Sequence, residues 1–251
     1  MSCSHLLFSL FLLAPCDDGA GGSEAIAEAL SNPARSAADR ERDAGRKPGE
    51  VLQFLGIGPG DKVLDLFASG GWYTQILDGI VGADGQVIAH NNTAYRDFTG
   101  KELDARFAAG ALPNTTAWVA EIDELKLQAN SLDAVMMSLV WHDLLYADPS
   151  FGWPDADETA LLSKLCTAMK PGAVLGVIDH VANPGGDPVE IARTLHRVDP
   201  ESVKQAITAS CFTLEAESDC LRNAGDDHTS DAFGGPLKGH TDQVVYRFVR
   251  R

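Results

Sequence analysis

Residues 62–74 constrain the fold of this chain more than any other stretch. They begin as an apolar run behind Pro59-Gly60-Asp61, break into small residues at Ser69-Gly70-Gly71, and lead into a helix-like apolar pattern. This order predicts a strand, a tight turn and a helix. Glycine has no side chain and the first turn of a helix has unpaired N–H groups, so a ligand can approach such a turn closely.

Three classes of ligand use a turn of this kind, and the residues distinguish them. A phosphate loop requires Gly-Lys-Ser/Thr, which is absent here. A dinucleotide turn requires G-x-G-x-x-G, of which only Gly70 and Gly71 are present. Asp65, at the end of the strand, favours a cationic ligand without a phosphate. The alternative, a plain strand-to-helix turn that binds nothing, stays open.

The strand, the acidic residue and the glycine-containing turn resemble the first motif of the class I S-adenosylmethionine (SAM)-dependent methyltransferases. Phe67 and Ser69 stand where that motif usually has glycine. Leu-x-x-x-x-Lys-Pro-Gly, from Leu165 to Gly172, is a second feature that resembles the family. The resemblance covers residues 35–251 and implies SAM as the cofactor. Within the family, the chain looks like a poorly characterised bacterial subfamily whose members often carry N-terminal signal peptides.

The order of the segments predicts an α/β fold. Successive βα units favour a parallel sheet with helices on both faces. The resemblance implies a Rossmann-like, doubly wound, mostly parallel seven-stranded sheet with an antiparallel last strand. The strands are expected near residues 62–66, 86–89, 116–120, 131–138, 173–178, 212–218 and 241–249. A length of 251 residues fits one such domain, which we assign to residues 23–251.

Residues 1–22 are expected to be a signal peptide or lipoprotein leader followed by a linker. The apolar run 6–14 has the length of a signal-peptide core. Residues 13–16 resemble a lipoprotein cleavage box, with Cys16 as the lipidated residue. We therefore expect export to the periplasm, or membrane attachment through Cys16. A cytoplasmic protein is the alternative.

The formal charge of -16 argues against nucleic acid as a partner, because an acidic surface repels a phosphate backbone. Beyond the leader, Cys166, Cys211 and Cys220 are odd in number. Such a set is not typical of a disulfide framework, so we expect buried, apolar cysteines. No pattern in the sequence indicates an oligomeric state.

Ligands of open α/β sheets bind beyond the carboxyl ends of the strands. The residues of the first motif are therefore candidates for cofactor binding. The resemblance implies further contacts after the second strand, where Asn91 replaces the usual acid that binds the ribose, and after the third, where an acid binds the adenine amine. The full set of predicted cofactor-binding residues is Asp65, Ser69, Gly70, Gly71, Tyr73, Asn91, Glu121 and Ile122.

Methyl transfer from an activated sulfonium requires alignment and a base for the nucleophile. His142, after the fourth strand, is the first candidate base, because an unperturbed pKa of about 6.5 suits proton removal at neutral pH. Asp179 or Asp143 can hold its tautomer, and His180 and His196 are alternates. Each histidine can also be purely structural.

We assign no metal, although carboxylates after the fourth and fifth strands bind Mg²⁺ in some catechol-type methyltransferases. Asp143 and Asp179 occupy comparable places. We expect a SAM-dependent methyltransferase that acts on a small, partly apolar molecule. The altered turn, Asn91 and the export signal favour an alternative, a non-catalytic protein that binds SAM or another small ligand. A nicotinamide-dependent oxidoreductase is the weakest alternative, because its glycine pattern is missing.

Overall fold

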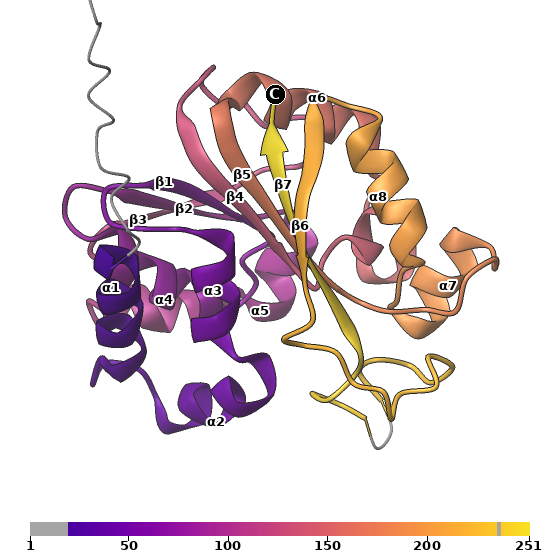
Figure 1. Cartoon of the computed structure of the whole chain (residues 1–251), viewed down its shortest axis with the longest axis horizontal. Coiled ribbons are helices and arrows are strands. Elements are labelled where there is room, and N and C mark those ends of the chain that lie inside the picture. Colours follow the sequence, from indigo (N-terminus) through magenta and orange to yellow (C-terminus); the bar gives the residue numbers. More distant parts are fainter. Residues whose placement is uncertain (1–19, 235–236) are drawn as a thin grey trace, which may run out of the picture.

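The computed structural model describes residues 20–234 and 237–251. They form a seven-stranded sheet of order β3-β2-β1-β4-β5-β7-β6 (Figure 1). The strands are β1 (Lys62–Leu66), β2 (Gln86–Asn91), β3 (Thr115–Val119), β4 (Leu132–Ser138), β5 (Met169–His180), β6 (Phe212–Ser218) and β7 (Gln243–Arg250). The first five strands are parallel, and β7 runs antiparallel to both of its neighbours. The predicted Rossmann-like sheet with an antiparallel last strand is confirmed.

Helices cover both faces of this sheet. In Figure 1, α1, α3 and α4 lie on one side, and α6 and α8 lie on the other. The helices are α1 (Ala20–Ser31), α2 (Ala37–Arg46), α3 (Pro48–Leu55), α4 (Trp72–Val81), α5 (Thr93–Ala108), α6 (Glu158–Ala168), α7 (Pro188–Leu195) and α8 (Pro200–Thr208). Two short 3₁₀ helices, η1 (His142–Leu144) and η2 (Pro149–Phe151), follow β4.

Strand β1 contributes to two separate cores, because successive side chains of a strand point to opposite faces. Leu64 and Leu66 belong to the core that includes α6 and α8, whereas Val63 packs with α3 and α4. This double burial explains the nearly continuous apolar run in the sequence. Asp65 interrupts that run and is only 3% exposed, so its burial requires an explanation at the site.

Side-chain caps set several helix boundaries. The side chain of Asp157 accepts a hydrogen bond from the backbone N–H of Ala160 and so caps α6 ahead of its first residue, Glu158. Helix α7 ends before His196, which adopts a left-handed conformation. The Lys-Pro-Gly motif at residues 170–172 lies within β5, at a shift in its register with β4.

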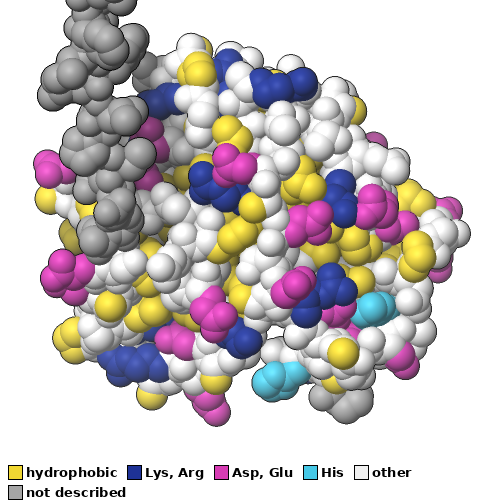
Figure 2. All heavy atoms as spheres, viewed as in Figure 1, with side chains coloured by type: hydrophobic (Ala, Val, Ile, Leu, Met, Phe, Trp, Pro, Cys, Tyr) yellow, Lys and Arg dark blue, Asp and Glu magenta, His cyan; other side chains and the backbone are white. Residues whose placement is uncertain are grey.

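Helix α1 begins at Ala20, so the last residues of the predicted 1–22 segment are helical. The apolar run 6–14 and Cys16 lie outside the described residues. Within the described ranges, none of the helices combines the length and apolar character that a bilayer-spanning segment needs. Figure 2 shows acidic and basic side chains interspersed with apolar atoms on one face of the molecule.

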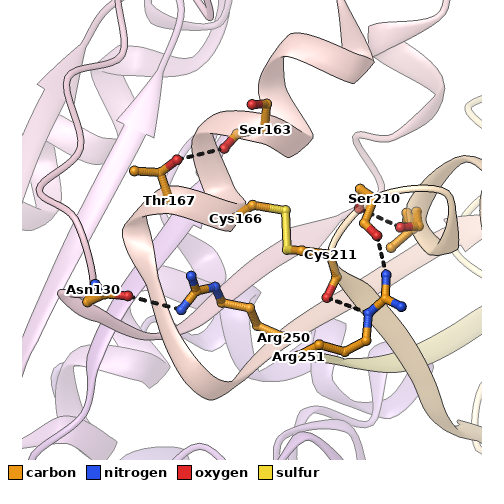
Figure 3. Close-up of a disulfide and its surroundings, with 9 residues drawn as sticks. Asn130, Ser163, Cys166, Thr167, Ser210, Cys211, Arg250 and Arg251 are labelled. Atoms are coloured by element: carbon orange, nitrogen blue, oxygen red, sulfur yellow. Dashed lines mark hydrogen bonds between the residues drawn. A yellow bond between two sulfur atoms is a disulfide. The ribbon is translucent and has the colours of Figure 1, made fainter.

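Cys166 of α6 and Cys211, just before β6, form a disulfide (Figure 3). The expectation of three free, apolar cysteines was therefore wrong for these two. An odd count is compatible with one bridge and one free thiol, and Cys220 is the free cysteine among the described residues. The bridge ties α6 to the turn between α8 and β6 across 45 residues of chain. The side chain of Arg251 donates to the carbonyl oxygen of Cys211 beside it.

Candidate functional site

The turn between β1 and α4 has an alternating left-handed backbone. Phe67, Ser69 and Gly71 have φ angles of 55°, 54° and 80°. Phe67 and Ser69 stand at the positions where the methyltransferase motif usually has glycine. A left-handed conformation costs a non-glycine residue about 1–2 kcal/mol, so the surrounding structure must stabilise it. The backbone thus keeps a glycine-like shape at two positions where the sequence has side chains.

Asn91, at the end of β2, holds this turn in place. Its side-chain oxygen accepts from the backbone N–H of Ser69 at 2.8 Å, and its amide donates to the Ser69 carbonyl at 3.0 Å. The Asn91 side chain is buried, and both of its polar ends are engaged by the turn. Asn91 therefore contributes to the site by shaping the Ser69 backbone.

Gly70 and Gly71 are tightly enclosed by α5. A Cβ atom on Gly70 would lie 2.2 Å from a carboxylate oxygen of Glu102, and one on Gly71 would lie 2.6 Å from Leu103. The side chain of Arg106 donates to the carbonyl of Gly70 at 2.8 Å. These glycines therefore allow the turn to pack against α5, in addition to leaving its backbone open toward the cavity.

Asp65 lies beneath this turn, where its carboxylate accepts a hydrogen bond from the Thr74 hydroxyl at 2.6 Å. Burial raises the pKa of Asp65 to about 7, although the Thr74 bond opposes the shift. A cation placed beside Asp65 would stabilise its ionised form. Tyr73, in the first turn of α4, has a buried hydroxyl without a hydrogen-bond partner in the protein.

Two cavities open beside the turn. The main cavity has a volume of about 700 Å³, and a second cavity of about 380 Å³ lies next to it. Phe67, Asp143 and Trp153 line both, so they form the partition between the two. The Phe67 ring stacks on Tyr95 with centroids 5.2 Å apart. A volume of this order suits a small-molecule ligand.

The predicted cofactor residues divide between the two cavities. Those that line the main cavity are Asp65, Ser69, Gly70 and Tyr73, and those that line the second are Glu121 and Ile122. One Glu121 carboxylate oxygen accepts from the backbone N–H of Thr93 at 3.1 Å, while the other is buried without a partner. The remaining two predicted residues, Gly71 and Asn91, line neither cavity.

His142 and Asp179 form a fully buried pair at the ends of β4 and β5. The Asp179 carboxylate lies 2.8 Å from His142 Nδ1 and accepts from the His142 backbone N–H at 2.9 Å. Burial disfavours the imidazolium, but the charges of Asp143 and Asp179 outweigh it and raise the pKa of His142 to about 9. His142 is thus protonated at neutral pH, in contrast to the unperturbed pKa expected from the sequence. It does not line either cavity.

Asp143 lies beside His142 and lines both cavities, so it connects the buried pair to the cavity walls. Its carboxylate lies 3.5 Å from His142 Nε2 and accepts hydrogen bonds from Tyr95 at 2.6 Å and Tyr146 at 3.2 Å. Burial and the Asp143 charge raise the pKa of both tyrosines, so both remain protonated at neutral pH. Sequence reasoning gave Asp143 only a supporting role and missed Tyr95, which is 48 residues away in the chain.

The two remaining predicted histidines differ. His180 is buried, its Nδ1 lies 2.6 Å from the Thr241 hydroxyl, and burial lowers its pKa to about 3, which keeps it neutral. His196 lines the main cavity, and its Nδ1 lies 2.9 Å from an Asp231 carboxylate oxygen. Of the four residues predicted to be catalytic, His196 is therefore the one in the cavity wall.

No protein-family model matches this chain, and no curated protein matches its sequence. Solved structures do match its fold. A SAM-dependent methyltransferase from Aquifex aeolicus superposes with a TM-score of 0.59 at 20% identity, over 90% of this chain and 98% of that protein. Geranyl diphosphate C-methyltransferase from Streptomyces coelicolor, solved with Mg²⁺, geranyl diphosphate and S-adenosyl-L-homocysteine, gives 0.57 at 14% identity, over 89% of each chain. The chain has the SAM-dependent methyltransferase fold.

This methyltransferase fold also occurs in a protein named for another reaction. The [4+2]-cyclase SpnF superposes with a TM-score of 0.58 at 16% identity, over 88% of this chain and 85% of that one. The fold alone therefore does not identify the reaction, and the residues of the site are needed as well. In the described part of the chain, no group of three or more His, Cys, Asp or Glu side chains is arranged to hold a metal ion.

The cavity residues of this methyltransferase fold suit a ligand with the chemistry of SAM. Asp65 offers a buried carboxylate to a cation, and the unpartnered Glu121 oxygen offers an acceptor to an amine or a hydroxyl. The two acids lie at opposite sides of the Phe67 partition. A ligand with a cationic end and a polar ring end would satisfy both.

Proposed function

We propose that this protein is a SAM-dependent methyltransferase that acts on a small molecule. The observation that carries the proposal is the turn at residues 67–71, which keeps the alternating left-handed backbone of a glycine motif above a buried Asp65. A plain strand-to-helix turn has no need of left-handed side-chain-bearing residues at these positions. The match of the fold to methyltransferases of known structure adds support.

SAM would be held by residues of both cavities. Asp65, Ser69, Gly70 and Tyr73 would hold its amino-acid end, and Glu121 and Ile122 would hold its adenosine end. When bound, the cofactor supplies a methyl group on a positively charged sulfonium, which is already activated for transfer. The chain itself must align the acceptor, exclude water and take up a proton.

Asp143 is the group that we propose to take up the acceptor's proton. It lines both cavities, and its carboxylate is fixed by Tyr95 and Tyr146. His142 and Asp179 would act as positioning residues behind it, because the imidazolium lies between the two carboxylates. His196 with Asp231 is the second candidate, since it also reaches the main cavity. His180 is assigned a structural role.

Titration calorimetry with SAM and with S-adenosylhomocysteine tests the proposal on the intact protein. We expect a dissociation constant in the micromolar range, which corresponds to about -8 kcal/mol. Turnover is then followed as S-adenosylhomocysteine released from a panel of small acceptors. Absence of binding at millimolar SAM would refute the proposed function. Binding without turnover on any acceptor would favour the non-catalytic alternative.

We also propose that the protein is exported, with membrane attachment through Cys16 as one form of this. The Cys166–Cys211 disulfide supports export, since disulfides persist in oxidising compartments and are rare in reducing ones. Fractionation of a bacterium that expresses the full chain, with mass spectrometry of the N-terminus and of both cysteines, tests this. An intact Met1 on a cytosolic protein with reduced cysteines would contradict it.

A further inference from the structure

Three basic side chains line the main cavity of this strongly acidic chain. Arg42 and Arg46 come from α2, and Lys238 comes from the loop between β6 and β7. Figure 1 shows α2 and this loop at the same end of the molecule. They are in contact there, since a Cβ atom on Gly45 would lie 2.8 Å from the carbonyl oxygen of Gly239. The three cations therefore form one group at the cavity, and we refer to Arg42, Arg46 and Lys238 as the rim.

None of these cations has an ion-pair partner among residues 20–234 and 237–251. Two of the three acids of α2 already pair with other arginines. Asp43 pairs with Arg35 at 2.6 Å, and Asp39 pairs with Arg106 at 2.8 Å. No ion pair of the described residues therefore neutralises these three cations, although Asp39, Asp43 and Glu102 act on Arg42 from a longer distance.

Arg46 is the cation of the rim whose positive charge is least compensated by its neighbours. Its guanidinium lies 5.2 Å from the centroid of the Trp72 ring, and that of Arg42 lies at the same distance from the same ring. Partial burial and the neighbouring charge of Arg42 lower the pKa of Arg46 to about 10. At Arg42, the charges of Asp39, Asp43 and Glu102 partly offset the lowering of the pKa by burial and by the neighbouring arginine. No carboxylate in the described part of the chain has this effect on the pKa of Arg46. A bound anion would relieve this repulsion.

SAM carries a net positive charge, and its single carboxylate would pair with no more than part of this group of three cations. A negatively charged acceptor would balance the remaining charge. The rest of the wall is aromatic, with Phe67, Tyr95 and Trp153 in mutual ring contact. Such a wall favours a flat apolar body over a hydrated polar one.

We propose that Arg42, Arg46 and Lys238 bind the carboxylate of a small aromatic acid, which is the methyl acceptor. This inference rests on the proposed function and specifies its substrate class. The carboxylate would lie at the rim, the ring against the aromatic wall, and the nucleophilic hydroxyl or amine toward Asp143. On transfer, the acceptor oxygen or nitrogen gains the methyl group, the sulfonium leaves as neutral thioether, and Asp143 takes up the proton.

Calorimetry on the intact protein with S-adenosylhomocysteine present tests the proposal, with benzoate as the probe and benzamide as its neutral counterpart. We expect benzoate to bind at least about tenfold more tightly than benzamide, as is usual for a charge-assisted contact. Arg46→Gln and Lys238→Gln should each weaken benzoate by about tenfold and leave SAM affinity unchanged. Arg40→Gln, at an exposed arginine of α2 outside the cavity lining, is the matched control and should change neither.

The outcomes are separable. If SAM affinity falls in Arg46→Gln while benzoate affinity holds, the rim binds the cofactor's own carboxylate and the proposal is overturned. Inorganic phosphate that binds more tightly than benzoate overturns the assignment to a carboxylate. A wild-type protein that binds SAM but not benzoate also overturns it, whereas failure to bind SAM refutes the proposed function itself. Because Lys238 is exposed, Lys238→Gln keeps the test valid if Arg46→Gln does not fold.

Discussion

Asn91 pairs with both backbone groups of Ser69, as acceptor at 2.8 Å and as donor at 3.0 Å. This arrangement fixes Ser69, which has a positive φ angle but lacks the conformational freedom that glycine has there. A side chain that the sequence suggested for the cofactor ribose thus acts on the backbone that would receive the cofactor.

Asn91→Asp separates these two roles, because it restores the acid that methyltransferases usually have at this position. We expect it to lower the free energy of unfolding by about 1–3 kcal/mol, since a carboxylate cannot donate to the Ser69 carbonyl. SAM affinity should fall as the turn relaxes. Urea unfolding and calorimetry measure the two effects. Tighter SAM binding in this variant would instead identify position 91 as a ribose contact.

Asp65→Asn should stabilise the ligand-free protein and impair cofactor binding. The folded-state pKa of about 7 lies above the unfolded value of about 3.9, so ionisation destabilises the fold as pH rises from 4 to 7. At pH 8 the variant should gain up to about 4 kcal/mol over the wild type, with no difference near pH 4. Its SAM affinity should fall at least about tenfold. Thermal unfolding across this pH range, with and without SAM, provides the measurement.

The pH dependence of wild-type stability should carry a contribution from His142. Its folded pKa of about 9 exceeds the unfolded value of about 6.5, so the stabilisation is complete below pH 6.5 and is lost as pH rises through 9. The full amount is about 3 kcal/mol. Urea unfolding of the wild type and His142→Gln between pH 6 and 10 should show this slope in the wild type alone.

His180 should contribute the opposite dependence. Burial holds its pKa at about 3, below the unfolded value, so its contribution is complete above pH 6.5 and is lost as pH falls. His180→Gln should therefore flatten the stability curve on the acid side, while His142→Gln flattens the alkaline side. Identical curves for the two variants would contradict their assigned charge states.

Loss of the disulfide should destabilise the fold without altering the site. Cys166→Ser with Cys211→Ser should cost about 2–4 kcal/mol, because the bridge closes a loop of 45 residues. SAM affinity should be unchanged, since neither cysteine lines a cavity. Cys220→Ser is the control for removal of a thiol. Equal thermal stability with and without a reductant would show that the bridge does not contribute.

The strands were predictable because most of them are apolar runs bounded by Gly, Pro or Asp, and the antiparallel last strand followed from the resemblance to methyltransferases. The site was predictable only at strand ends. Asp65, Glu121 and Asp179 lie at or just after the carboxyl ends of strands, so topology alone brings them to one edge. Tyr95 and Arg46 come from helices, and their direction depends on packing that no local pattern records. The Cys166–Cys211 bridge depends in the same way on two distant segments that meet.

The left-handed turn has a consequence for how such proteins are detected. A glycine signature describes the easiest sequence for that backbone, and Phe67 and Ser69 reach the same shape without it. Two hydrogen bonds from Asn91 and ring packing around Phe67 take over what glycine would otherwise provide. A search by backbone dihedral angles would therefore detect this turn where a search for glycines in the sequence does not.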